Sequence, residues 1–191
     1  MEILHPVWNL KPGVGSQLSR SSRPLVGEGR NRRVIPSDHN AWMTPENLAG
    51  LVVGEGCFYA ESVSDRKYRF GWRIRPAFCI ELRHDDREVL EEVRAYLSCG
   101  NVYDLDFGRY RGYEARGWRR HAKYRVSNLA DLQSKVVPFF RRHVLFGRKR
   151  RAFEIFAELV ESMSRREHLS EDGFLKVRDL AEQLTEHNRR G

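Results

Sequence analysis

Residues 48–58 read LAGLVVGEGCF, a stretch of apolar residues and glycines in which Glu55 is the one charged residue. It follows Thr44 and Pro45, a hydroxyl N-cap and a proline at the first helical position, which together predict that a helix begins there. The helix is apolar on nearly every side, so we expect it to be buried on nearly every side. Gly50 and Gly54 lie four residues apart on one stripe, where they would let another backbone approach closely.

Glu55 comes at the end of this helix, and its position runs against a local electrostatic preference. The carbonyl groups at a helix C-terminus carry partial negative charge, so a carboxylate beside them is disfavoured. A residue that breaks a local rule invites a functional explanation. Glu55 is therefore the first candidate functional residue.

Downstream of the helix the hydrophobic period changes from that of a helix to that of a strand. Between Phe70 and Leu82 apolar side chains occupy mainly even positions, whereas the polar ones occupy odd positions. This alternation predicts a hairpin, starting at Phe58, with one buried face and one solvated face. A second hairpin is expected from strands at 102–107 and 119–127.

Helices are expected around these hairpins. An amphipathic helix covers residues 85–97 and stops at Gly100, and another starts after its cap Asn128 and ends or bends at Pro138. Two further helices are predicted at about 148–163 and 171–184.

The order of helix, two strands, helix, two strands and helices predicts an α+β domain over residues 42–191. Residues 1–41, with four prolines and little apolar periodicity, are interpreted as a basic, mostly irregular arm. The arginines of this arm are suited to lie along phosphates, and a free tail is the alternative. A chain of 191 residues has room for one domain of ordinary size and such an arm.

Positive charge is concentrated in one part of the chain. The formal net charge is +8, from 34 Lys and Arg against 26 Asp and Glu. Between Arg109 and Arg151 there are fourteen basic residues and two acidic ones, so the rest of the chain is net acidic. A concentrated basic surface suits a polyanion, whose phosphates would supply most of the non-specific affinity. On charge alone, a solvated basic face is the alternative.

The sequence predicts neither a membrane span nor secretion. No apolar run approaches the roughly 18 to 20 residues that cross a bilayer, and the N-terminus lacks the apolar core of a signal peptide. Cys57, Cys79 and Cys99 fit neither a CxxC metal motif nor a disulfide framework, so we interpret them as reduced thiols. We expect a cytoplasmic, nucleoid-associated protein or an organellar one.

Residues 48–58 resemble the signature of the LAGLIDADG homing endonucleases, and the αββαββα order agrees with that family. The resemblance covers about residues 42–185 and leaves out the arm. It implies the LAGLIDADG fold, with a curved antiparallel sheet and C-terminal helices. Further matching features are Pro76, Phe78 and Ile80 in the second strand, the helix that leads to Gly100, and the segment 138–153 with its Gly147-Arg148-Lys149.

The resemblance implies a site-specific double-strand DNA endonuclease that works as a homodimer. In the family, two signature helices pack against each other on a twofold axis, so the one signature seen here supplies half of an active site. Each helix brings its terminal acid, here Glu55 beside Gly54, to a shared Mg²⁺ or Mn²⁺ centre for phosphodiester hydrolysis. The helix contacts implied for the dimer interface involve Leu48, Gly50, Leu51 and Gly54.

A basic residue also lies near the site in this family, and Arg148 and Lys149 match that position. Membership of the phosphate-binding run is the alternative role for both. The polar strand face would lie in the major groove of a long pseudo-palindromic site, where arginine pairs with guanine. An ordinary solvent-facing strand surface is the alternative. The predicted base readers are Tyr59, Glu61, Arg73, Arg75, Cys79, Lys123 and Arg125, and the predicted phosphate contacts are Arg69 and Arg120.

Two residues depart from the family pattern. Val53 stands where the signature usually has an acidic residue that supports the helix end. Leu82 falls near the polar position that organises water at the scissile phosphate, and this role stays unassigned, with Glu81 and Cys79 as nearby polar residues. The alternative function is therefore a catalytically degenerate member that acts as an intron RNA maturase or a DNA-binding regulator. The intact Glu55 favours the enzyme.

Overall fold

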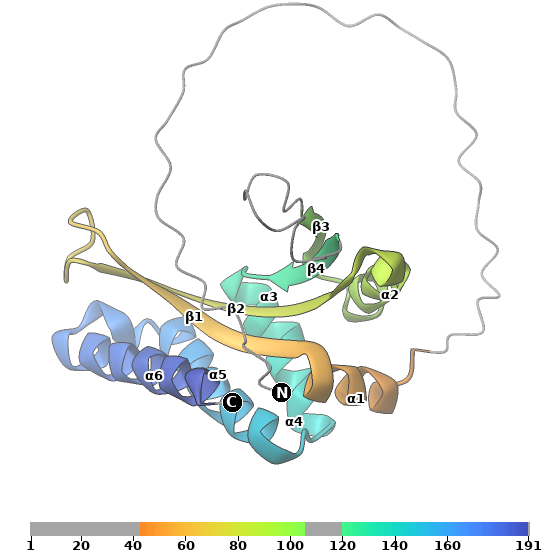
Figure 1. Ribbon diagram of the computed structural model, residues 1–191. Helices are drawn as coiled ribbons and strands as arrows, with labels where there is room; N and C mark the ends of the chain where they lie inside the picture. Colours follow the sequence, from red (N-terminus) through yellow and green to blue (C-terminus); the bar gives the residue numbers. More distant parts are fainter. Residues whose placement is uncertain (1–42, 106–119, 191) are drawn as a thin grey trace, which may run out of the picture. The chain divides into compact units, whose positions relative to one another are not determined.

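The computed structural model describes residues 43–105 and 120–190, so the predicted arm lies outside the described residues (Figure 1). None of the helices in these two ranges is long and apolar enough to cross a membrane. The described elements follow the order that the sequence predicts. They are α1 (Pro45–Glu55), β1 (Gly56–Ser64), β2 (Trp72–Arg83), η1 (His84–Asp86), α2 (Arg87–Leu97), β3 (Asn101–Leu105), β4 (His121–Val126), α3 (Leu129–Asp131), η4 (Leu132–Val136), α4 (Val137–Arg142), α5 (Gly147–Ser164), η5 (Glu167–Leu169) and α6 (Glu171–Arg189).

The four strands form one antiparallel sheet in the order β1-β2-β4-β3. β1 pairs with β2 as far as Ser64 opposite Trp72. β4 pairs only with the Phe78–Arg83 part of β2. The β1–β2 hairpin therefore extends beyond β4 as a two-stranded ribbon, which curves over the C-terminal helices in Figure 1.

Even-numbered strand residues form the core against the helices, as the alternation predicts. Phe58, Phe78 and Tyr124 are fully buried. The Phe58 ring stacks on Phe78 with 5.0 Å between centroids, and its other neighbours include Phe140 of α4 and Phe153 of α5. The sheet and the helices both contribute rings to this core. Their burial supplies much of the hydrophobic stabilisation of the domain.

The opposite face of the sheet is less open than the alternation predicts. Ala77 and Cys79 occupy odd positions in β2, yet they are 0% and 6% exposed. The expectation that all odd positions are solvated is therefore wrong at the centre of the sheet. β2 lies between β1 and β4. The Arg125 guanidinium of β4 bonds to the Glu61 carboxylate of β1, so these two long side chains meet over β2 and cover it.

Helix α1 starts as predicted but buries only one stripe within this chain. The hydroxyl of Thr44 accepts a hydrogen bond from the amide of Asn47 at 3.2 Å, which confirms the N-cap. Leu48 and Val52 are the buried residues of the helix, and Gly50 is exposed. The described part of one chain thus covers one side of a helix that is apolar on nearly every side.

The helix that follows Asn128 passes through Pro138 and does not end there. Asn128 caps its start, and the π-helical turn η4 lies ahead of the proline, with the amide of Val137 bonded to the carbonyl of Leu132. Proline has no amide donor and crowds the preceding turn, so a wider turn lets the helix continue. The sequence predicted an end or a bend at Pro138, and the structure has this local change of helix type.

Gly100 packs against β4, whereas Gly71 has open space around it, so the two glycines can be compared to test this packing. Both have positive φ angles, +75° and +70°. A Cβ at Gly100 would lie 2.7 Å from the ring of Tyr124, whereas one at Gly71 would meet nothing within 4 Å. We expect Gly100→Ala to lower the free energy of unfolding by about 2–4 kcal/mol and Gly71→Ala by about 1 kcal/mol. Urea denaturation measures both values, and equal losses would show that packing at Gly100 does not matter.

Candidate functional site

The end of α1 presents oxygen atoms at the surface. Glu55 is the last residue of the helix and is exposed, as is Gly54. Among the described residues, no hydrogen bond or ion pair engages the Glu55 carboxylate. The last carbonyl groups of a helix also lack partners within the helix. This helix end therefore combines a free carboxylate with carbonyl oxygens.

Lys149 and Arg148 contact different parts of the domain although they are neighbours in sequence. The ammonium of Lys149 donates to the carbonyl of Gly56, the residue directly after Glu55. The guanidinium of Arg148 donates to the carbonyl of His187 in α6 at 2.6 Å, and the His187 ring bonds back to the carbonyl of Arg148 at 3.0 Å. Of the two predicted cations, Lys149 therefore contacts the start of β1, and Arg148 contacts α6.

Two cysteines face each other beside this helix end. Cys57 and Cys79 are directly opposite in the β1–β2 register. A hydrogen bond with the Cys79 thiol lowers the pKa of Cys57 to about 7, against the effect of burial, and Lys149 and Lys123 also lower this pKa. The same hydrogen bond, with burial, raises the pKa of Cys79. These two free thiols are neighbours only because of the register of the hairpin, which no pattern in the sequence indicates.

Two ion pairs cross the polar face of the sheet. Glu61 bonds to Arg125 at 2.7 Å, and Glu81 bonds to Lys123 at 2.9 Å. The Arg125 guanidinium also lies 5.9 Å from the centre of the Tyr59 ring. Tyr59 lies opposite Ala77 in the register, and the small side chain of Ala77 leaves room for Arg125 to reach over β2. Glu61, Arg125 and Tyr59 therefore form one cluster on this face.

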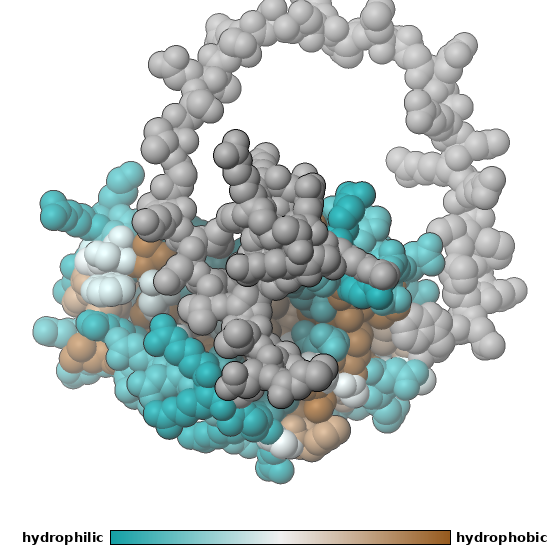
Figure 2. All heavy atoms as spheres, viewed as in Figure 1, coloured by the Kyte–Doolittle hydropathy of each residue, from teal (hydrophilic) through white to brown (hydrophobic). Residues whose placement is uncertain are grey.

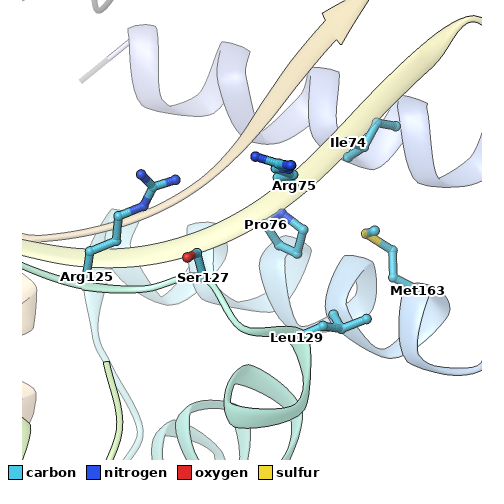
Figure 3. A pocket seen from close by; sticks show the side chains of 7 residues that line it. All are labelled: Ile74, Arg75, Pro76, Arg125, Ser127, Leu129 and Met163. Carbon is cyan, nitrogen blue, oxygen red and sulfur yellow. The ribbon is translucent and has the colours of Figure 1, made fainter. Parts of the chain in front are cut away.

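Arg75 lies at the open edge of the hairpin, where β4 no longer pairs with β2. It is exposed and lines a groove of about 420 Å³ with Arg125 and Ser127. Figure 3 shows the two guanidinium groups on the same side of the sheet, with Met163 and Leu129 extending from the helices on the other side. The groove thus offers positive charge above an apolar wall.

The structure places the other predicted contact residues differently. Arg69 donates to the carbonyl of Leu169 at 3.1 Å and lies over the ring of Phe70, so it is engaged within the domain. Arg120 is exposed. Arg73 is half-buried on β2, and Cys79 is covered, which disfavours Cys79 as a base reader. Reading roles for these residues stay predictions.

One known family combines the features described above, which are a helix with an acidic end, two hairpins and a lysine at that helix end. The family model described as LAGLIDADG endonuclease matches residues 48–160, which is more than half of the chain. The chain belongs to the LAGLIDADG endonuclease family. The match extends from α1 into α5, and the LAGLIDADG fold predicted from the signature is confirmed.

Individual LAGLIDADG proteins resemble this chain in sequence and in structure. A protein named probable intron-encoded DNA endonuclease 1, from Mycosarcoma maydis, is 38% identical over 50% of this chain and 30% of its own length. The homing endonuclease I-TnaI is 28% identical, with a TM-score of 0.63 over 78% of this chain and 97% of the I-TnaI chain. The meganuclease I-SmaMI, bound to uncleaveable DNA, is 27% identical, with a TM-score of 0.63 over 72% of this chain and 43% of its own.

These comparisons cover different shares of the relatives. The chain spans 26–30% of the length of the three curated relatives it matches. Another I-SmaMI structure contains its uncleaved DNA target in the presence of calcium ions, and at 22% identity this likeness shows the fold alone. The activity and partners of this chain are therefore inferred from its own site.

Proposed function

We propose that this protein is a site-specific double-strand DNA endonuclease of the homing type that works as a homodimer with Mg²⁺ or Mn²⁺. The observation that carries the proposal is the free carboxylate of Glu55 at the end of α1, next to the Lys149 contact. It acts on a long pseudo-palindromic DNA site in the compartment of its host DNA, either the nucleoid or an organelle. Membership of the LAGLIDADG endonuclease family supports this assignment.

The open face of α1 supports a homodimer. A Cβ at Gly50 or Gly54 would meet nothing within 4 Å, and Leu51 is only partly buried. Figure 2 shows hydrophobic residues at the surface in the region of α1 and α4, whereas the surface over α5 and α6 is mostly hydrophilic. A second copy of α1 packed on this face would bury the apolar stripe and bring the two helix ends together through Gly50, Leu51 and Gly54. Leu48, which was also predicted for the interface, is fully buried in the core of its own chain, so its interface role is wrong.

The donor atoms at the helix end fit a hard divalent cation. The described residues hold no group of three or more His, Cys, Asp or Glu that could bind a metal ion, which agrees with a centre completed by a second copy. The Glu55 carboxylate and the Gly54 carbonyl supply the oxygen ligands that Mg²⁺ prefers. Mg²⁺ held there supplies charge stabilisation for phosphodiester hydrolysis. Lys149 places a further positive charge beside the phosphate that is cut, and Arg148 is assigned to holding α6.

The proposed DNA surface is the polar face of β1, β2 and β4, which enters the major groove. Arg75 reads bases from the exposed edge, with Arg73 next along the same face. Arg125, oriented by Glu61, and Lys123, oriented by Glu81, read bases nearer the helix end. Arg120 contacts phosphate.

Cleavage of plasmid libraries with randomised sites tests the proposed function. The protein is incubated with supercoiled plasmids and Mg²⁺, and the DNA ends are sequenced. We expect double-strand ends at a narrow set of related sites with twofold symmetry, and none when a chelator replaces Mg²⁺. Cleavage without sequence preference would contradict the proposal.

One observation favours the alternative, a binding protein without catalysis. The Leu82 side chain packs against the hydrophobic core, so it cannot organise the water at a phosphate. Specific binding of DNA or of intron RNA, with no cleavage under Mg²⁺ or Mn²⁺, would support a regulator or a maturase.

Glu61→Gln is expected to separate affinity from specificity. The change removes the charge that neutralises Arg125 and leaves the guanidinium less firmly oriented. We expect non-specific DNA binding to strengthen and its logarithmic salt slope to steepen by about one per subunit, while base preference near Arg125 weakens. Binding to a randomised library at two salt concentrations measures both effects. Glu154→Gln, which frees Arg150 and Arg151 on the exposed side of α5, is the control for charge alone.

Arg75→Ala is expected to change base preference, whereas Arg150→Ala is expected to change only the overall affinity for DNA. Arg75 lies on the proposed reading face, whereas Arg150 lies in the run 148–151 at the start of α5 and pairs with Glu154. The first change should cost about 1–3 kcal/mol on the preferred site and relax one symmetric pair of base positions, whereas the second should weaken all sequences alike. The same library measures both. A uniform loss for Arg75→Ala would show that Arg75 does not read bases.

A further inference from the structure

The end of the β1–β2 hairpin lacks support from the rest of the sheet. β4 pairs with β2 only from Phe78 onward, so residues 61–64 and 72–75 form a two-stranded ribbon in the described structure. A two-stranded hairpin is marginally stable by itself in water. Contacts outside the sheet must therefore hold this ribbon at a defined angle.

The C-terminal helical segment supplies three such contacts. The Phe70 ring stacks on Phe174 of α6, with 4.8 Å between centroids and 21° between planes. The guanidinium of Arg178 lies 4.9 Å from the centre of the Trp72 ring. Arg69 donates to a backbone carbonyl of η5. Three of the four residues from 69 to 72 thus contact a helical segment about 100 residues away in sequence.

Backbone hydrogen bonds connect the residues of the turn to one another. The amide of Asp65 bonds to the carbonyl of Gly71 at 2.9 Å, and the amide of Gly71 bonds to the carbonyl of Tyr68 at 2.8 Å. Docking of Phe70 and Trp72 therefore orients the whole end of the hairpin.

Docking of one face of the hairpin on the helices also sets the direction in which its opposite face points. Side chains alternate along a strand, so Trp72 and Ile74 toward the helices leave Arg73 and Arg75 on the opposite face. Arg73 lies opposite Val63, seven residues beyond Gly56. At about 3.3 Å per residue, Arg73 is roughly 23 Å along the strand from the helix end, a span of about seven base pairs.

We propose that Phe174 and Arg178 of α6 are positioning residues for DNA specificity. They hold the hairpin at the curvature that lets Arg73 and Arg75 reach the outer base pairs of each half-site. Their contacts lie on the helix-facing side of the hairpin, so they act through the strand and not on DNA. This inference rests on the proposed function, and it names the elements that set the outer limit of the recognised sequence.

The test compares the base preference of variants at every position of the half-site. Phe174→Ala removes the ring that stacks on Phe70, and Phe174→Tyr keeps it. Arg178→Lys keeps the charge but not the planar guanidinium that lies over the Trp72 ring. Leu175→Ala is the control, because Leu175 is the next residue of α6 and is 54% exposed.

Binding to a library with randomised positions, and limited trypsin cleavage at the hairpin end, are the two measurements. For Phe174→Ala and Arg178→Lys we expect discrimination at the outer positions to fall about tenfold, with discrimination at the inner positions unchanged. We also expect faster cleavage after Arg66 and Lys67, while Phe174→Tyr and Leu175→Ala behave as wild type. A uniform loss over all positions, or no loss at the outer ones, overturns the positioning role. A wild-type protein that selects no sequence overturns the proposed function, and the positioning role with it.

Discussion

Glu55→Gln should lower DNA cleavage by about 10²–10³-fold or more and leave DNA binding intact. Glutamine keeps the size of the side chain but removes the charge that would hold a divalent cation, so stabilisation of the reacting oxygens is lost. Glu55 is exposed at the helix end, and the described residues supply no partner for it. The fold should therefore tolerate the change. Binding should be equal or slightly stronger, because one negative charge facing phosphate is gone.

The comparison for Glu55→Gln is Glu46→Gln, at the other end of the same helix. Glu46 is exposed in the first turn of α1 and is not part of the proposed centre. Single-turnover cleavage of the preferred site and a binding titration without Mg²⁺ measure the two properties separately. Unchanged cleavage by Glu55→Gln would remove the metal role, and so would an equal loss in Glu46→Gln.

Gly50→Leu should convert the protein to a folded monomer that no longer cuts its site. Within one chain, a Cβ at Gly50 would meet nothing within 4 Å, and leucine favours a helix more than glycine does. The isolated chain should therefore be as stable as wild type or more so. Between two copies of α1, each added side chain costs about 1–3 kcal/mol of overpacking, so dimerisation should weaken tenfold or more. Each copy would then hold only half of the proposed metal centre.

Light scattering at micromolar concentration, with and without DNA, measures this change together with thermal denaturation. Glu88→Leu places the same side chain on an exposed position of α2, outside the proposed interface, and should remain dimeric. A wild-type protein that is monomeric in both conditions would contradict the homodimer. A loss of folding in Gly50→Leu would contradict the open face of α1.

Local signals in the sequence were sufficient to predict the helices and strands and to place an acidic residue at the end of the first helix. The hydroxyl of Thr44 and the side-chain oxygen of Asn128 accept hydrogen bonds from backbone amides and cap helices where the sequence predicts them. Such caps, and the change of hydrophobic period after Gly56, depend on residues a few positions apart. This is why Glu55 could be placed at the end of a helix from sequence alone.

Local patterns in the sequence do not distinguish Arg148 from Lys149. Consecutive helical residues point about 100° apart, so the helix as a whole decides which of them contacts the end of α1. The packing of α5 against the sheet brings Lys149 to Gly56 and directs Arg148 to His187. Charge counting gives both residues the same role, whereas the structure gives them different partners.

The α+β element order, the caps and the candidate Glu55 were determined by the sequence itself, because each follows from short-range periodicity and backbone chemistry. Only the tertiary structure decided that Cys57 opposes Cys79, that Arg125 reaches Glu61, and that Arg69 is bound to η5. These contacts depend on strand register and on helix docking between segments 20 to 100 residues apart. A shift of one residue in register would move every side chain to the other face. Burial of the whole core selects the register and the docking, which no local pattern specifies.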